Sequence, residues 1–411
     1  MIPSSAATRR HAEARLADFV PQMGRAYADG RNHDRGPGRH RSVSVLSPFL
    51  RRRLLLEQDV VAAARNGHGA AADKFVQEVV WRSYFKGWLE LRPAIWRDYR
   101  AELAKDRERL AADDRLSDLA ARVETGTSGM ECMDHWSDEL RATGYLHNHA
   151  RMWFASIWIF TFGLPWRLGA DFFLRHLLDG DPASNTLSWR WVAGLHTRGK
   201  AYEATADNIA RFTGGRFHPE GLARDVAALH WTEPDGPPPA MMPTFGPPPD
   251  PQRPTLLLIT EEDCRPEDFD LPSYDLRGVL TLAASHLRST RKVASMVVAF
   301  EAAALADAAN RAIKVGLPRL DQQVVINLQA AAPADLVAAA RAVGATQIAT
   351  AWLPQGPMAD WMIGAQPDLR EAGIELRHWT RPWDRIFWPR ATGGFFKIRK
   401  DIPRLLDRLD I

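Results

Sequence analysis

Several polar side chains between residues 148 and 191 have the types and spacing that could hold one ligand. Asn148, Arg151 and Met152 stand at i, i+3 and i+4, so on a helix they share one face. The Asp-Gly-Asp sequence at 179–181 places two carboxylates around a glycine, where backbone and acids can approach a ligand closely. These residues predict a polar binding site. The alternative is that they are ordinary core and surface residues of a helical protein.

Two helices are expected to position these groups. Residues 150–162 are almost wholly apolar, which is typical of a helix buried inside a large helical domain. Residues 73–91 predict a second helix, on which Glu78, Trp81 and Arg82 fall on one stripe. An acid, an aromatic ring and an arginine on one stripe are more typical of a cavity wall than of a core. A partly buried Glu–Arg pair on an ordinary helix is the alternative.

The chain divides by composition into two parts joined by a linker. Residues 231–254 are rich in proline, which is typical of a semi-extended linker. Beyond the linker, short apolar runs alternate with alanine-rich helices, and this alternation predicts a parallel α/β sheet. Strands are expected at 255–260, 278–284, 324–328, 346–353 and 374–379. We therefore expect an all-helical domain at 1–230 and a Rossmann-like α/β domain at 255–411.

Charge, cysteine content and hydropathy limit the possible partners. The two cysteines, Cys132 and Cys264, lie far apart and belong to no metal-spaced cluster, so we expect no disulfide framework, no metal ligands and a cytoplasmic location. No stretch is long and apolar enough for a signal peptide or a membrane span, so we expect a soluble protein with no membrane partner. We expect a monomer, although the sequence leaves the oligomeric state open. Net charge is only +3, but arginines outnumber acids within residues 1–60, which predicts a local basic patch.

Taken together, these motifs resemble the FAD-binding domain of the cryptochrome/photolyase family. The resemblance rests on HN-x-x-RM at 147–152, DGD at 179–181, Asn185, W-x-W at 189–191 and E-x-x-W-R at 78–82. Residues 42–48, SVSVLSP, resemble the family's T-S-x-L-S phosphate-binding segment, with Val43 in place of threonine. The alternative is that these serines simply form the N-cap of a helix. The resemblance implies FAD as cofactor, held by Tyr27, Ser44, Leu46, Ser47, Phe75, Arg82, Arg151, Asp179, Asp181 and Asn185.

The same resemblance implies light-driven electron transfer, in which the cofactor carries the chemistry and the protein positions it. The residues implied in catalysis are Glu78, Asn148, Asn185 and two inner members of a tryptophan relay, Trp166 and Trp189. Val123 stands where the outer tryptophan is usual. Contact with UV-damaged DNA is implied for Arg31, Glu78, Trp81, Asn148, His149, Met152 and Trp191.

Asn148 and Met152 match the family enzymes that act on cyclobutane dimers, so the implied activity is that of a deoxyribodipyrimidine photolyase, a carbon–carbon lyase. One alternative is a cryptochrome-like blue-light photoreceptor that binds FAD without repair. Another is a flavoprotein whose altered DNA face serves a different redox or binding role. Family members place an α/β domain ahead of the FAD domain, so its position at 255–411 predicts a circular permutation. The sequence marks no antenna chromophore.

Overall fold

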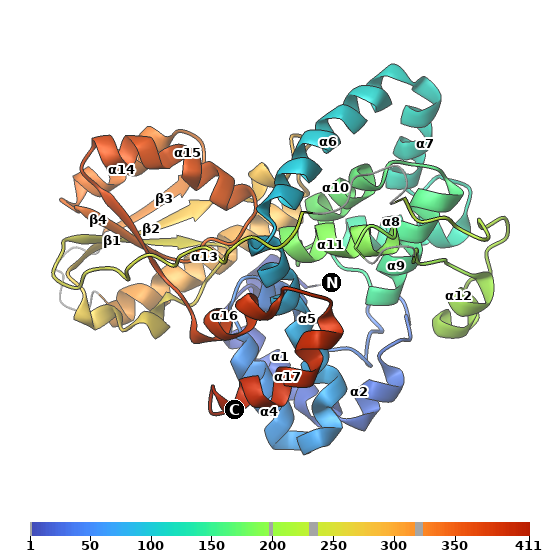
Figure 1. The fold of residues 1–411 in the computed structure, drawn as a ribbon, viewed down its shortest axis with the longest axis horizontal. Coiled ribbons are helices and arrows are strands. Elements are labelled where there is room, and N and C mark those ends of the chain that lie inside the picture. The colour runs from blue at the N-terminus through green and yellow to red at the C-terminus, as the bar shows by residue number, and fades with distance from the viewer. Residues whose placement is uncertain (1, 197–199, 230–236, 317–323) are drawn as a thin grey trace.

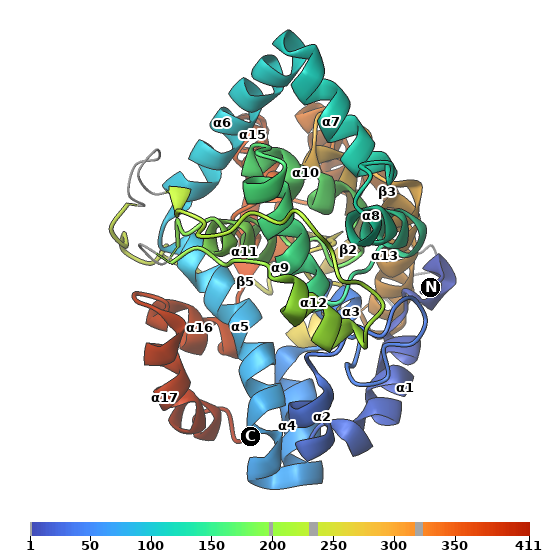
Figure 2. The ribbon, with the colours of Figure 1, turned by 90° about the vertical axis from the view of Figure 1, so that its right-hand side faces the viewer.

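The computed structural model of this protein describes residues 2–196, 200–229, 237–316 and 324–411. Helices build the first half of the chain, and a parallel sheet with its own helices builds most of the second half (Figures 1 and 2). This arrangement confirms the predicted fold class. The helices of the first half are α1 Arg9–Phe19, α2 Arg25–Gly30, α3 Ser47–Arg51, α4 Glu57–His68, α5 Asp73–Glu90, α6 Pro93–Ala112, α7 Asp114–Thr125, α8 Glu131–Thr143, α9 Asn148–Ser156, α10 Trp166–His176, α11 Pro182–Val192 and α12 Ala206–Thr213.

The two helices expected around the site are both present. The predicted helix at 73–91 is α5, and the apolar helix at 150–162 is α9 followed by a π-helical turn at Ile157–Thr161. Trp153 and Trp158 are fully buried in this second segment, as its uniform hydrophobicity predicts. Of the expected linker, residues 231–236 lie outside the described residues, and the part that is described contains no helix or strand before Thr255.

The sheet has five parallel strands in the order β3–β2–β1–β4–β5. Along the central strand, Leu256 and Leu258 pack into one hydrophobic cluster, whereas Leu257 and Ile259 pack into another. Because successive strand side chains point to opposite faces, both faces need a cover of helices. α14 and α15 cover one face and α13 the other (Figure 1). The elements are β1 Thr255–Thr260, β2 Leu276–Ala283, α13 Ser295–Gly316, β3 Val325–Gln329, α14 Pro333–Ala342, β4 Gln347–Ala351, α15 Pro357–Glu371 and β5 Glu375–Trp379.

Buried ion pairs join the carboxyl end of β1 to the helical half. The pairs are Arg51–Glu262 at 2.7 Å, Arg52–Glu261 at 3.0 Å and Arg53–Asp263 at 3.5 Å. This end of an open parallel sheet is where ligands usually bind, and here these ion pairs occupy it. Since all three arginines are buried, the surface patch predicted within residues 1–60 is smaller than the sequence suggests.

The last two helices, α16 (Pro382–Phe387) and α17 (Phe395–Asp407), pack against α5 of the helical half (Figures 1 and 2). Gly87 of α5 permits this contact, because a Cβ there would lie only 2.6 Å from the Trp388 Cα. The chain thus returns to the helical half after completing the sheet. The exact domain boundaries remain a prediction.

Candidate functional site

The acidic turn between α10 and α11 is shaped by its own sequence. Asp181 caps α11, because its Oδ1 accepts a hydrogen bond from the Ser184 N–H at 2.7 Å, and Pro182 follows at the first helical position. Gly180 must lack a side chain, since a Cβ would lie 2.8 Å from an Arg288 guanidinium nitrogen and 3.0 Å from the Leu177 carbonyl oxygen. The turn therefore holds its two carboxylates in fixed positions.

Asp179 forms an ion pair with Arg151, and the resemblance implies both residues in holding the cofactor. Arg151 Nη2 donates to Asp179 Oδ2 at 2.9 Å, and its Nε donates to the Leu146 carbonyl at 2.9 Å. Burial alone would raise the pKa of Asp179, but the charge and hydrogen bond of Arg151 lower it overall. Among the described residues, the other carboxylate oxygen, Oδ1, is buried without a hydrogen-bond partner. A buried acceptor of this kind is expected to meet a donor from a ligand.

Asp181 lies among three cations from α3 and α5. Its Oδ2 is 3.4 Å from Lys86 Nζ, 3.7 Å from Arg82 Nη1 and 3.9 Å from Arg51 Nε. Burial opposes ionisation, yet these charges together lower the pKa of Asp181 well below its usual range. Arg82 also donates to the Ser47 carbonyl at 3.4 Å, so Ser47, Arg82 and Asp181 are brought together. Sequence reasoning missed Lys86, although its i+4 spacing from Arg82 was the available signal.

Tyr27 and Phe75 meet at the far end of α5. Their rings contact edge to face with centroids 5.0 Å apart, and both side chains are buried. Burial, with a smaller contribution from Glu78, raises the pKa of Tyr27. Beside them, Arg31 of the chain after α2 forms an ion pair with Glu78. Two residues predicted to contact DNA thus neutralise each other.

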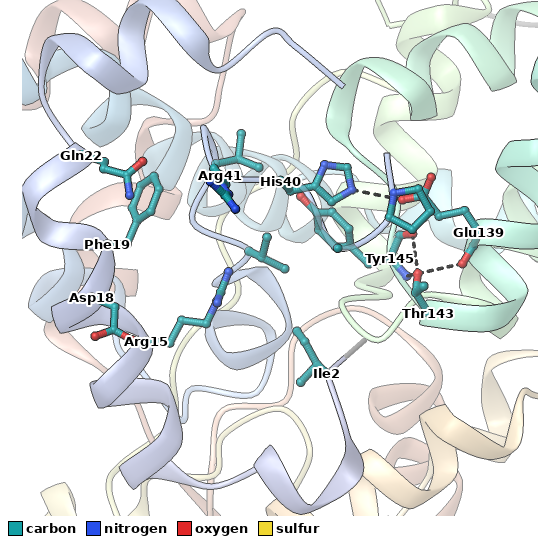
Figure 3. Close-up of a pocket in the computed structure, with 14 residues that line it drawn as sticks. Ile2, Arg15, Asp18, Phe19, Gln22, His40, Arg41, Glu139, Thr143 and Tyr145 are labelled. Atoms are coloured by element: carbon teal, nitrogen blue, oxygen red, sulfur yellow. Dashed lines mark hydrogen bonds and ion pairs between the residues drawn. The ribbon is translucent and has the colours of Figure 1, made fainter. Parts of the chain in front are cut away.

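A cavity of about 490 Å³ lies beside the serine segment (Figure 3). It is bounded by α1, by residues 37–45 and by the end of α8. Val43 and Val45, which flank Ser44, line it, as does Tyr145, whose ring lies 5.4 Å from the Arg151 Cζ. The predicted flavin-binding residues themselves are not among its lining residues. Tyr145 thus connects this cavity to the Arg151–Asp179 pair.

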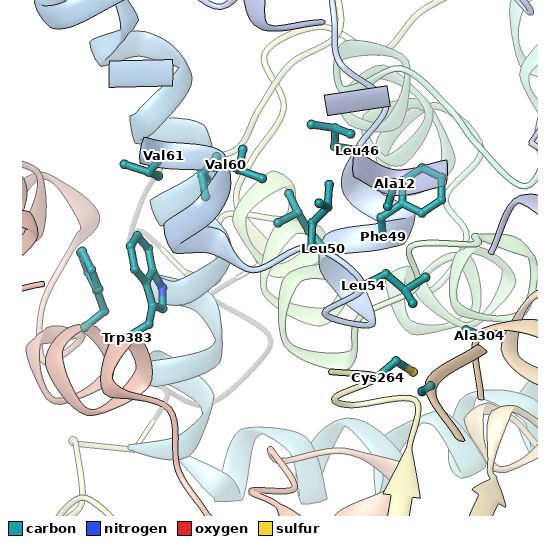
Figure 4. Packing of buried hydrophobic residues seen from close by; sticks show 14 of the residues in the cluster. Ala12, Leu46, Phe49, Leu50, Leu54, Val60, Val61, Cys264, Ala304 and Trp383 are labelled. Carbon is teal, nitrogen blue, oxygen red and sulfur yellow. The ribbon is translucent and has the colours of Figure 1, made fainter. Parts of the chain in front are cut away.

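The serine segment is fixed by local hydrogen bonds. Ser44 Oγ accepts from the Leu46 N–H at 3.3 Å, and the Ser44 carbonyl accepts from Arg15 Nε at 3.0 Å. Leu46 is almost fully buried and belongs to a hydrophobic cluster that runs from α1, α3 and α4 to α13 and α16 (Figure 4). Its side chain therefore serves the core, and only its backbone remains for contact with a ligand.

The two predicted aromatic walls face side chains of the protein itself. Trp81 stacks on Phe395 at the start of α17, with ring centroids 3.7 Å apart and planes inclined by 12°. Trp191 packs against Tyr202 at 5.5 Å and 32°. Sequence reasoning missed Phe395, which lies more than three hundred residues from Trp81 along the chain.

Asn148 is exposed at the start of α9, and its Nδ2 lies 3.8 Å from Met152 Sδ, one helical turn away. His149, by contrast, packs between Trp153 and Phe212, each with a ring centroid 5.2 Å away. Burial lowers the pKa of His149, so it stays neutral and offers little attraction to a phosphate group.

The predicted electron relay is buried and surrounded by other aromatic rings. Trp189 lies 5.1 Å from Phe173 and 6.4 Å from Trp158 between ring centroids. Asn185, one turn earlier on α11, donates through Nδ2 to the Ala170 carbonyl at 2.8 Å. Trp166 packs against Tyr99 at 5.7 Å.

Comparison with known proteins shows what the residues around this site are similar to. Residues 75–220 match the family model described as the FAD binding domain of DNA photolyase. This part of the helical half is similar to the cryptochrome/photolyase family. The deoxyribodipyrimidine photo-lyase of Streptomyces griseus is 34% identical over 210 residues, covering 48% of this chain and 44% of the relative. That of Thermus thermophilus is 32% identical over 214 residues, covering 51% and 47%.

The chain thus spans less than half the length of these relatives. Among solved structures, a bacterial class III photolyase from Agrobacterium tumefaciens aligns with a TM-score of 0.42 and 27% identity, over 50% of this chain and 43% of its own. Within the described part of the chain, no helix is both long and apolar enough to cross a membrane.

Proposed function

We propose that this protein binds FAD in its helical half and, under blue light, splits cyclobutane pyrimidine dimers in UV-damaged DNA. The observation that carries the proposal is the Arg151–Asp179 ion pair, whose carboxylate is buried, two residues from an Asp181 carboxylate surrounded by cations. The match of residues 75–220 to a photolyase FAD-binding domain supports the cofactor, and the named relatives support the reaction.

The polar groups of this region fit a flavin nucleotide. Asp179 Oδ1 is a buried acceptor without a partner among the described residues, and it suits an N–H group of a ring system. Arg82 Nη1 also lacks a hydrogen-bond acceptor within the described residues, so it can serve a carbonyl or phosphate oxygen. When bound and reduced, FAD would supply the excited electron that opens the dimer.

The side chains of the protein would orient the cofactor and keep water away from it. Arg151 holds Asp179 ionised in one orientation, and Lys86 and Arg82 do the same for Asp181. The hydrogen bond to the Ala170 carbonyl fixes the amide plane of Asn185. Charges buried in this way are preorganised, because they do not have to rearrange during the reaction.

Repair also requires the dimer to leave the duplex and enter a pocket. Trp81 and Trp191 are the proposed walls, with Glu78, Asn148 and Met152 at the base edges. Since Phe395 covers one face of Trp81, a base can stack there only after α17 moves or by using the opposite face. Of these two routes, the proposal takes displacement of Phe395 by the lesion.

The same contact favours the second candidate function, a blue-light photoreceptor without repair. A ring already stacked on Trp81 at 3.7 Å takes the place that a flipped base would occupy. In that case illumination would change the conformation of the protein instead of repairing DNA, and α17 would be the element that moves.

The deciding experiment is loss of thymine dimers from an oligonucleotide, after the protein has been loaded with FAD, reduced and illuminated with blue light. A dark sample and the Glu78→Gln variant serve as controls, since the variant keeps the shape of a predicted lesion contact but removes its charge. We expect light-dependent dimer loss that is slower in the variant. Retention of all dimers by a protein with bound, reduced flavin would exclude repair and leave the photoreceptor.

A further inference from the structure

Three side chains with metal-binding chemistry, none of them from the Asp179–Asp181 turn, meet at the edge of the cavity. Asp34 and His40 lie on the loop between α2 and α3, and Glu139 lies on α8. One ligand atom from each lies within 4.8 Å of the others. His40 and Glu139 line the cavity, and Figure 3 shows their side chains pointing toward each other. Nothing in the sequence spacing brings these three residues together.

Asp34 is held rigidly from several sides. Its Oδ1 accepts from the Gly36 N–H at 3.0 Å, and its Oδ2 accepts from Trp136 Nε1 at 3.3 Å. Arg216 Nη2 lies 2.9 Å from the same Oδ2. The Asp34 side chain is fully buried, so its carboxylate is already held in position, and the nearby Arg216 offsets part of its negative charge.

His40 and Glu139 are buried but not fully satisfied. His40 Nε2 lies 3.1 Å from Glu139 Oε1, whereas His40 Nδ1 stands 3.9 Å from Asp34 Oδ1, too far for a hydrogen bond. Among the described residues, neither His40 Nδ1 nor Glu139 Oε2 has a hydrogen-bond partner. Their side chains are only 7% and 2% exposed, so water at the surface does not solvate them. Buried polar atoms without partners are unfavourable and point to a missing group.

We propose that Asp34, His40 and Glu139 bind a divalent transition-metal ion, with Zn²⁺ as the probe of choice. One imidazole and two carboxylates form a donor set that suits Zn²⁺. Metal–ligand distances of about 2.1 Å in a tetrahedron separate ligand atoms by about 3.4 Å. The observed 3.1 Å between His40 Nε2 and Glu139 Oε1 is close to this value. The 3.9 Å to Asp34 is measured from the other ring nitrogen, Nδ1, so one ion cannot use both distances. With one ligand atom from each residue, the three atoms lie within 4.8 Å of one another, and the ligands must close in around the ion. The fourth position can hold a water molecule on the side of the cavity.

The neighbouring His147 does not complete the site. Its ring stacks on His40 with centroids 5.8 Å apart, but both of its nitrogens are engaged. Nε2 donates to the Arg31 carbonyl at 3.0 Å, and Nδ1 accepts from the His149 N–H at 3.2 Å. His147 therefore supports the His40 ring by stacking and leaves three protein ligands for the ion.

Such an ion would join the loop that carries Arg31 and Ser44 to α8. The loop forms one wall of the cavity, and α8 ends just before Tyr145 on the opposite wall. Metal binding would therefore hold the two walls at a fixed separation. The proposal does not depend on FAD, so it can fail or succeed independently of the proposed function.

The test is titration of Zn²⁺ into chelator-treated protein, followed by calorimetry. The variants are Glu139→Gln and His40→Gln, which remove a ligand at similar size, and the matched control is His218→Gln. His218 also lies 3.4 Å from a carboxylate, that of Asp207, but its side chain is 63% exposed. Circular dichroism of every variant checks that it is folded, and Co²⁺ absorbance of the unaltered protein reports coordination without any substitution.

We expect one Zn²⁺ per chain in the unaltered protein and in the His218 variant. Affinity for Zn²⁺ should fall by more than about 100-fold in Glu139→Gln and His40→Gln. Loss of a residue that only hydrogen-bonds a ligand already weakens metal binding about 10–100-fold, and loss of a ligand itself should weaken it more. Absence of a Co²⁺ ligand-field spectrum together with no Zn²⁺ binding would overturn the proposal, and so would binding that the Glu139 and His40 variants retain. The contact would then be only a hydrogen bond between His40 and Glu139.

Discussion

The contact between Trp81 and Phe395 makes the sharpest prediction about access to the lesion pocket. Phe395 is the first residue of α17, is 3% exposed and lies parallel to the indole at 3.7 Å. Replacing it by alanine uncovers one face of Trp81. Its neighbour Phe396 is 68% exposed and provides a matched control in the same helix.

The size of the effect follows from two competing stacks. Stacking of a base on an aromatic side chain contributes about 1–3 kcal/mol. An aromatic pair within a protein contributes about 0.5–1.5 kcal/mol beyond its burial, and a base must displace it. Phe395→Ala should therefore strengthen binding of dimer-containing DNA by about 1 kcal/mol, or roughly fivefold. The substitution should also lower the free energy of unfolding by about 3 kcal/mol, because it removes a buried aromatic side chain. The loss stays at this lower end of the usual range because the other buried residues of α17 still pack against the core.

The assay is fluorescence anisotropy of a labelled oligonucleotide with and without one thymine dimer, measured for the unaltered protein, Phe395→Ala and Phe396→Ala. Urea unfolding confirms that each protein is folded at the assay temperature. We expect the preference for the dimer to rise only in Phe395→Ala. Equal preferences in all three proteins would show that the lesion does not stack on the face of Trp81 that Phe395 covers, and the proposed displacement would be wrong.

Three further predictions concern charges. Asp179→Asn should lower the free energy of unfolding by about 2–3 kcal/mol and reduce flavin retention. Breaking a fully buried ion pair costs about 3–5 kcal/mol, and the expected cost is smaller here because the Arg151 side chain is 24% exposed. Unchanged urea midpoints and flavin content would contradict this. Burial opposes ionisation of Glu261, yet its arginine partners lower its pKa to about 2, below an unfolded value of about 4.3. The contribution of ionised Glu261 to the free energy of unfolding is therefore complete above about pH 5 and is lost as the pH falls toward 2. Acid unfolding curves should therefore be shallower for Glu261→Gln, and identical curves would count against the assignment. Arg39→Ala and Arg41→Ala, at exposed loop positions, should each reduce the slope of log affinity for DNA against log salt by about 0.9 if they contact phosphates; an unaltered slope would exclude that contact.

Local features of the sequence predicted the elements and the short-range pairs of the site. Five apolar runs bounded by loops predicted the strands, because a buried parallel strand needs a continuous hydrophobic sequence. Arg151 and Asp179 were both implied at the site by a resemblance whose motifs lie within some forty residues. Similarly, Glu78 and Arg82 share the face of α5 that helical periodicity requires.

Contacts between distant segments could not be predicted in the same way. The arginines at 51–53 were expected at the surface, but their partners at 261–263 lie about two hundred residues away. The stack of Phe395 on Trp81 and the contact of His40 with Glu139 likewise join residues that lie far apart in the sequence. Each depends on how the two halves and the long loops pack, which neither composition nor periodicity encodes.

The most direct test of the account is the flavin content of the purified protein. After incubation with FAD and removal of the unbound cofactor, absorbance near the flavin maximum and chromatography of the released nucleotide give the molar ratio. We predict one FAD per chain in the unaltered protein and a clear loss in Asp179→Asn, with the fold of both verified by circular dichroism. A folded, unaltered protein that retains no FAD would contradict the central claim.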